Sequence, residues 1–212
     1  MYKFVWILSM LLCANAWCDK ALEKLVDQIQ NHYDSVNTLS AKFEQTYESV
    51  RFENKQKASG QLTVKKPGKM RWDYQVPKGK VLVADGNTIT LYDPKDRQAI
   101  VSKQPKDQGL PAALSFLAGK GNLKKSFNFS WIQKPKDDTA ILKATPKSPE
   151  PNIKELELTV SELSHPLIVS TAVLDELKGK SQITFSKIRL NTKVSDKTFA
   201  FKVPKKATII NQ

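Results

Sequence analysis

The side chains of this chain that could do chemistry are two histidines, two cysteines and a scattered set of carboxylates. A histidine can act as a general acid or base, or it can orient a serine nucleophile. His32, however, falls in a stretch with helical spacing, and His165 precedes Pro166 in a predicted turn. Neither has a catalytic motif around it. We therefore interpret His165 as a surface turn residue rather than a catalytic one.

The wider motif inventory also predicts a protein that is not an enzyme. The sequence has no HExxH or paired-cysteine zinc motif, no G-x-S-x-G nucleophile elbow and no glycine-rich phosphate loop. Glu155 and Glu157 alternate with apolar residues, which places both on the solvated face of a predicted strand. We expect neither a cofactor nor a bound metal.

The N-terminus has the layout of a secretory signal peptide. Lys3 is followed by an apolar run over residues 4–14 and by Ala14-Asn15-Ala16, an A-x-A cleavage pattern. This run is shorter than the roughly 20 apolar residues that a membrane-spanning helix needs. We predict a signal peptide over residues 1–16 and one exported domain over residues 17–212, soluble in the periplasm.

The two cysteines flank this cleavage site. A lipoprotein signal needs a small residue before the modified cysteine, but Leu12 precedes Cys13 and Trp17 precedes Cys18. Cleavage after Ala16 would leave a single cysteine, and cleavage after Cys18 would leave none. Neither alternative allows an intramolecular disulfide.

The chain is strongly basic, with 34 Lys and Arg against 21 Asp and Glu and a formal net charge of +13. Such a charge attracts anionic surfaces, whether phospholipid, lipopolysaccharide or nucleic acid. Export and the thin spread of the lysines argue against nucleic acid. The plainest interpretation is a solvated basic surface.

Hydrophobic periodicity predicts one helix followed by a large antiparallel sheet. The helix carries an apolar stripe from Leu22 to Val36, with Asp19 as its N-cap. After Leu39 the period changes to two, which is typical of strands with one apolar and one wet face. Turn signals separate about ten or eleven strands, the last of them at Phe199 and Phe201. The expected architecture is a barrel or a strongly curved sheet.

One apolar stretch, residues 108–119, interrupts the strands and predicts a short inserted helix, with Pro111 in its first turn and Gly119 at its C-cap. Two short helices cannot cover the whole continuous apolar face of such a sheet. Either a dimer partner or an apolar ligand would have to cover the rest. Periodicity alone leaves both possibilities open.

Several short motifs, in order, resemble those of the periplasmic outer-membrane lipoprotein carrier family, LolA. They begin with Ser40-Ala41-Lys42-Phe43-Glu44-Gln45 and continue through Val64-Lys65-Lys66-Pro67-Gly68 to Met70-Arg71-Trp72-Asp73-Tyr74. Asp85-Gly86-Asn87, Leu91-Tyr92-Asp93, Leu110-Pro111 and Thr198-Phe199-Ala200-Phe201 follow in family order. The resemblance covers nearly the whole exported chain.

This resemblance implies an unclosed, strongly curved antiparallel β-barrel, with helices forming a lid over an apolar cavity. The cavity would take the acyl chains of lipoproteins released by an inner-membrane ABC-type complex and pass them to an outer-membrane lipoprotein receptor. The implied cavity residues are Leu62, Val64, Met70, Trp72, Tyr74, Leu91, Phe129 and Trp131. The implied lid residues are Leu110, Pro111, Leu114, Phe116 and Leu117.

A lid latch follows from the same resemblance. The family often has an arginine before the proline of the V-K-x-P turn, where it hydrogen-bonds the lid and holds the empty carrier shut. Lys66 occupies that position here, and Arg71 is a possible substitute. We expect a monomer. The alternatives are a carrier of another lipid or glycolipid on the same fold, and an envelope-binding protein with a filled core and no ligand.

Overall fold

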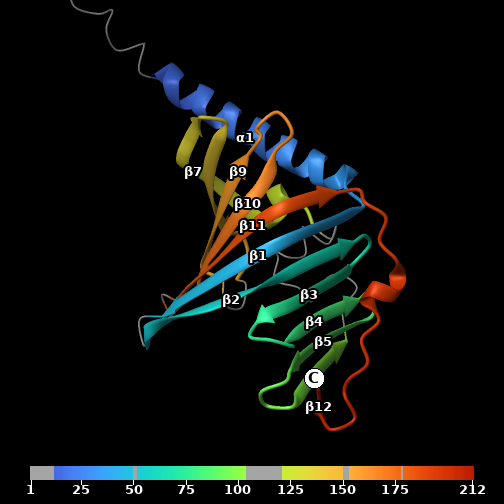
Figure 1. Ribbon diagram of the computed structural model, residues 1–212. Helices are drawn as coiled ribbons and strands as arrows, with labels where there is room; N and C mark the ends of the chain where they lie inside the picture. The colour runs from blue at the N-terminus through green and yellow to red at the C-terminus, as the bar shows by residue number, and fades with distance from the viewer. Residues whose placement is uncertain (1–11, 50–51, 104–120, 150–152, 178) are drawn as a thin grey trace, which may run out of the picture.

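The computed structural model describes residues 12–49, 52–103, 121–149, 153–177 and 179–212. These residues form one twelve-stranded sheet and a long N-terminal helix, α1 (Leu12–Ser35) (Figure 1). The strands are β1 (Thr38–Ser49), β2 (Phe52–Lys65), β3 (Lys69–Val76), β4 (Val81–Asp85), β5 (Thr88–Asp93), β6 (Gln98–Lys103), β7 (Phe127–Lys136), β8 (Thr139–Pro146), β9 (Glu155–Ser161), β10 (Leu167–Leu174), β11 (Lys180–Leu190) and β12 (Thr208–Asn211). Two short helices complete the described fold, α3 (Leu123–Ser126) and the 3-10 helix η1 (Asp196–Phe199).

The strands follow the order β12-β6-β5-β4-β3-β2-β1-β11-β10-β9-β8-β7. Every neighbouring pair is antiparallel except β12 and β6, which run parallel. β12 and β7 stand at opposite ends of this order, so the curved sheet is an unclosed barrel. The predicted fold class is therefore confirmed, with twelve strands among the described residues in place of ten or eleven.

Two local predictions were wrong. Asp19 lies inside α1, which begins at Leu12, so Asp19 is not the N-cap of this helix. Phe199 lies in η1 rather than in a strand. The aromatic side chain of Phe199 packs on Val81 and Val83, which belong to a core of their own on the face of the sheet opposite α1. We call that face the outer face and the face covered by α1 the inner face.

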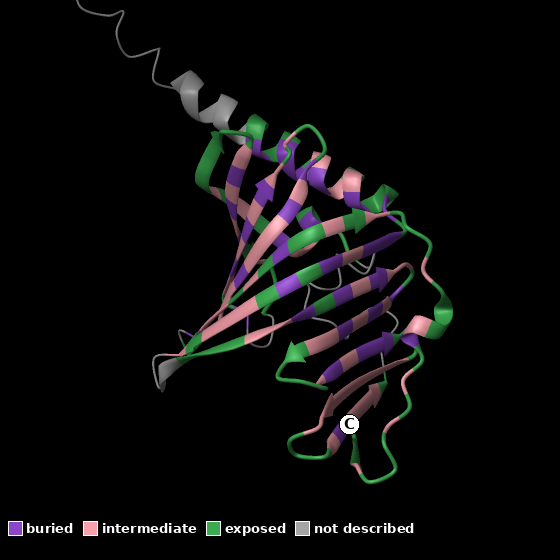
Figure 2. Cartoon of the chain, in the orientation of Figure 1, coloured by how far each residue is buried: buried purple, intermediate pink, exposed green. Residues whose placement is uncertain are grey.

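The larger core joins the apolar stripe of α1 to the inner face of the sheet. Buried residues alternate along the strands and form one stripe of α1 (Figure 2). Val26, Ile29 and Tyr33 of this stripe are almost fully buried. The predicted amphipathic helix thus packs its apolar stripe against the sheet.

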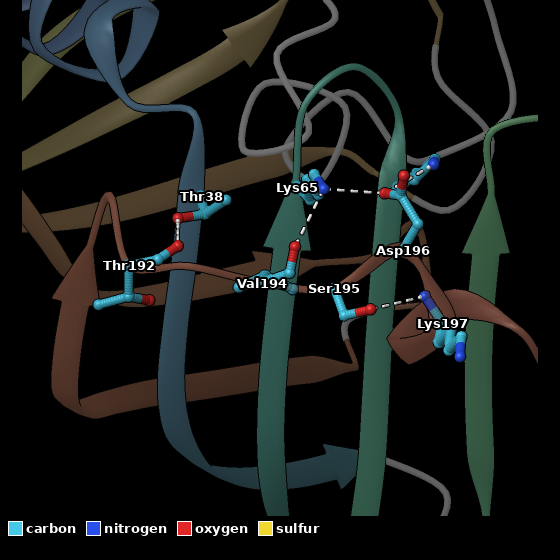
Figure 3. Close-up of polar contacts among 8 residues, drawn as sticks. Thr38, Lys65, Thr192, Val194, Ser195, Asp196 and Lys197 are labelled. Carbon is cyan, nitrogen blue, oxygen red and sulfur yellow. Dashed lines mark hydrogen bonds and ion pairs between the residues drawn. The ribbon is translucent and has the colours of Figure 1, made fainter.

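The chain after β11 is fastened to the sheet by polar contacts (Figure 3). The Thr38 hydroxyl donates to the Thr192 carbonyl oxygen over 2.6 Å. The Lys65 ammonium group binds the Val194 carbonyl oxygen at 3.0 Å and the Asp196 carboxylate at 2.9 Å. The hydrogen bond from Lys65 helps to hold the pKa of Asp196 below its usual value. These contacts bring η1 onto the outer face, where it completes the second core.

Candidate functional site

Strand register places the predicted cavity residues in rows across the inner face. Leu62 pairs with Trp72, Trp72 with Leu82, and Leu82 with Leu91. Directly paired residues of an antiparallel sheet point to the same face. Leu62 and Trp72 are buried in the inner core, whereas Leu91, further along the row, is half-buried.

A second row runs parallel to the first. Val64 pairs with Met70, and Met70 pairs with Ala84. Val64, Met70 and Ala84 are all buried, with exposures of 1% or less. The alternation read from the sequence thus identified residues that share one apolar surface.

Aromatic rings gather where β1, β2 and β3 meet. The Phe43 ring lies 4.7 Å from the Trp72 ring and 5.1 Å from the Tyr74 ring, both edge to face. Gly60 pairs with Phe43 across the sheet, and a Cβ at Gly60 would stand only 2.1 Å from the Asp73 carbonyl oxygen and 2.9 Å from the Phe43 ring. Only glycine fits at this position, which makes room for the aromatic cluster.

The other half of the inner face carries the remaining predicted residues. Phe129 and Trp131 lie on β7, half-buried, and pack against the inner core. Leu142, Leu156 and Leu158 come from the neighbouring strands β8 and β9 and are buried in the same core. The apolar surface therefore continues along the sheet to its β7 edge.

Tyr33 fixes the C-terminal part of α1 to the sheet. Its hydroxyl oxygen accepts a hydrogen bond from the backbone N–H of Ile168 on β10 at 3.0 Å, and this bond is buried. Burial raises the pKa of Tyr33 to about 12, so the phenol stays neutral at physiological pH. The sequence placed Tyr33 on the apolar stripe, but no sequence signal indicated its hydrogen bond.

A small cavity of about 10 Å³ lies beside Tyr33, with room for about one water molecule. Its lining residues come from α1 and four strands: Tyr33, Leu39, Ala41, Leu62, Ile168, Phe185 and Ile188. At this point the helix fills the space over the inner face almost completely.

Lys66 holds the last turn of α1. Its ammonium group donates to the Tyr33 carbonyl oxygen and lies 3.5 Å from that of Asp34. A cation at these carbonyls also interacts favourably with the negative end of the helix dipole. Partial burial lowers the pKa of Lys66, and the nearby Asp34 carboxylate partly opposes this shift. Lys66, the predicted latch residue, therefore hydrogen-bonds to the C-terminal end of α1.

Arg71, the other predicted latch residue, lies on the outer face. Its guanidinium is 2.7 Å from the Asp73 carboxylate, and it donates to the Thr198 carbonyl oxygen at 3.0 Å. It also lies over the Phe201 ring. Arg71 thus secures the C-terminal segment, and its role as a substitute latch stays a prediction.

Two more contacts attach α1 to the region around α3. The Leu123 backbone N–H donates to the Gln30 side-chain oxygen at 2.8 Å, and Lys124 forms an ion pair with Asp27 at 2.6 Å. Spacing alone placed Asp27 on the polar face of the helix without naming its partner. The predicted lid residues Leu110, Pro111, Leu114, Phe116 and Leu117 lie outside the described residues.

The histidines have no catalytic arrangement in the described part of the chain. His165 is exposed in a turn, as predicted. His32 is half-buried on α1, and partial burial followed by the nearby His165 lowers its pKa, while Glu162 acts in the opposite direction. No cluster of metal-binding side chains occurs among the described residues, and no described helix is long and apolar enough to cross a membrane.

The fold and this surface define a class of protein: an unclosed β-barrel whose apolar inner face is covered by a helix. A family model described as outer membrane lipoprotein carrier protein LolA matches residues 34–202, well over half of the chain. The chain belongs to the LolA family.

Individual proteins agree with this assignment. The outer-membrane lipoprotein carrier protein of Dechloromonas aromatica is 30% identical over 188 residues, which cover 88% of each chain. That of Legionella pneumophila, strain Corby, is 30% identical over 187 residues, covering 87% of this chain and 88% of the relative. An uncharacterized conserved protein from Thermus thermophilus has the same fold, with a TM-score of 0.57 at 11% identity over 90% of this chain and 98% of its own.

Proposed function

We propose that this protein is a periplasmic carrier that binds the acyl chains of lipoproteins. The observation that carries the proposal is the apolar inner face, which continues from Leu91 through Trp72 and Leu62 to Trp131 without closing into a barrel. The family assignment supports the same conclusion, because relatives at about 30% identity are named lipoprotein carriers.

Physical chemistry explains why such cargo needs a carrier. Each methylene removed from water contributes about 0.8 kcal/mol, so several long acyl chains are very costly to expose. A curved apolar sheet can cover them during transit. The inner-membrane ABC-type releasing complex would load the carrier, and the outer-membrane lipoprotein receptor would accept the cargo.

Loading would require α1 to leave the inner face. The cavity beside Tyr33 holds about 10 Å³, far too little for an acyl chain. Besides its buried apolar stripe, α1 is held by a few polar contacts: Lys66 and Ile168 bind Tyr33, Leu123 binds Gln30, and Lys124 binds Asp27. Water can satisfy each of these polar groups once the helix has moved, and the acyl chains that then cover the inner face would offset the cost of exposing the apolar stripe.

Met70→Glu tests the proposal at the centre of the inner face. Met70 is fully buried, so a glutamate there adds a charge to an apolar site at a cost of several kcal/mol unless it reaches water. We expect a large loss of affinity for a fluorescent acyl probe with little change in circular dichroism. Val76→Glu is the matched control, since Val76 lies on the same strand and is 51% exposed.

Wild-type affinity in Met70→Glu would refute the assignment of the inner face as the acyl site. The cargo itself can be identified independently by native mass spectrometry and lipid extraction of the protein as purified. Recovery of lipoproteins supports the proposal, whereas recovery of another lipid alone would favour the alternative carrier. A transfer assay between inner- and outer-membrane vesicles, with the releasing complex and receptor present, tests the proposed partners.

A further inference from the structure

One polar atom on the inner face has no partner among the described residues. The indole nitrogen Nε1 of Trp72 is buried, and no hydrogen-bond acceptor lies within reach. The side chain as a whole is only 3% exposed. Buried N–H groups are nearly always paired in folded proteins, so an exception at the centre of a candidate binding surface calls for an explanation.

The neighbours of Trp72 are apolar. Leu62 and Leu82 flank it across the sheet, and the Phe43 and Phe185 rings lie 4.7 Å and 6.3 Å from its ring. A phenylalanine would fill the same kind of surroundings without bringing an unpaired donor. The N–H group therefore does not serve the packing of the closed form.

We propose that the Trp72 indole N–H donates a hydrogen bond to a carbonyl oxygen of the cargo, at the ester or amide that joins an acyl chain to its head group. This inference rests on the proposed carrier function. A hydrocarbon chain offers no acceptor, and its linking carbonyl is the first acceptor along it. The described neighbours of the indole carry no cation, so the site suits a neutral carbonyl better than the carboxylate of a free fatty acid.

The chemical consequence is selectivity for the linkage as well as for the chains. An ether-linked lipid of equal chain length would fill the same apolar surface but lack the carbonyl acceptor. The indole N–H would then stay unpaired, which lowers affinity in the way that a missing hydroxyl does in other polar sites. The inner face would thus distinguish acylated cargo from bare hydrocarbon.

The test compares two synthetic lipopeptides that differ only in linkage, one with two ester-linked hexadecanoyl chains and one with two ether-linked hexadecyl chains. We expect the wild type to bind the ester form about tenfold more tightly, as one hydrogen bond predicts. Trp72→Phe should abolish this preference and keep the affinity for the ether form. Tyr92→Phe is the control, because it removes a polar hydrogen from an aromatic side chain that packs beside Phe201, with ring centroids 5.8 Å apart, and it should retain the preference.

The nitrogen-15 resonance of the Trp72 indole gives a second measurement. It is made on the wild-type protein and does not depend on whether a variant folds. The resonance should move downfield with the ester lipopeptide and not with the ether form. Equal binding of both lipopeptides by the wild type, a preference that survives in Trp72→Phe, or an indole resonance that responds equally to both would overturn the inference. If the wild type binds neither lipopeptide, the proposed carrier function itself fails, whereas binding without preference refutes only the role of the indole.

Discussion

Removing one hydroxyl from α1 should make the empty carrier open more readily. Tyr33→Phe keeps the buried ring but removes the acceptor for the Ile168 backbone N–H. The ladder between β9 and β10 is irregular between Ile168 and Ser170, and Tyr33 supplies the bond at this irregular position. In the closed variant, the N–H would be buried without a partner. In an open form, water would satisfy it.

The size of the effect follows from that difference. Leaving a buried N–H unpaired costs about 1–3 kcal/mol. If the open form pays none of this cost, its population relative to the closed form rises by roughly 5- to 150-fold. Apparent affinity depends on the fraction of protein that can bind, so affinity for acyl chains should rise by a similar factor while the open form remains a minor species.

Two assays measure this prediction. Titration with a fluorescent acyl probe should show tighter binding by Tyr33→Phe than by the wild type. Hydrogen exchange should show faster exchange of the Ile168 amide and of the α1 amides. Tyr92→Phe provides the control, because Tyr92 packs beside Phe201, with ring centroids 5.8 Å apart, away from α1.

Two outcomes would refute the reasoning. If Tyr33→Phe is folded but binds acyl probes no more tightly than the wild type, the hydrogen bond does not favour the closed form. If α1 amides exchange faster without any gain in affinity, α1 opens, but its movement does not control access to the inner face.

Further predictions concern the other groups that hold α1. Lys66→Met removes the ammonium from the helix C-terminus and should raise acyl affinity severalfold. Lys66→Arg should lower acyl affinity, because the planar guanidinium can bind both carbonyls at once. Titration with the fluorescent acyl probe measures both effects. The lowered pKa of His32 means that the unfolded chain binds a proton more readily than the folded one. The free energy of unfolding should therefore be undiminished above about pH 6.5 and fall as the pH drops below that value, and His32→Gln should flatten this dependence in urea unfolding.

The sequence predicted the inner face well, because burial on one face of a sheet imposes a period of two on the chain. Leu62, Met70 and Trp72 follow this pattern and are buried together. The same period-two rule gave a wrong prediction near the C-terminus, where a strand was expected. Phe199 and Phe201 alternate as strand residues do, but Phe199 belongs to a 3-10 helix packed on the outer face. Its position depends on tertiary contacts, such as that of Arg71 with the Thr198 carbonyl, and no local pattern encodes them.

The contacts of α1 were also beyond sequence reasoning. An apolar stripe predicts which side of a helix is buried, but it does not identify the backbone groups that lie opposite. The resemblance singled out Lys66 but assigned its bond to the lid. In the structure its ammonium lies at the last carbonyls of α1, and the predicted lid residues lie outside the described residues. Long-range pairs of this kind arise only when the sheet curves and brings β2, β10 and α1 together.

The same inner face can serve both the empty and the loaded carrier because α1 and an acyl chain would bury the same surface. Val26 and Ile29 of α1 pack in the core on this face and are themselves protected from water. If cargo displaced the helix, the inner face would keep its apolar cover, while the helix stripe would become exposed and oppose the gain from burying the chains. The net affinity is therefore smaller than the buried acyl area alone would give. A receptor that offers a better apolar surface could then remove the cargo, and the closing of α1 would favour its release.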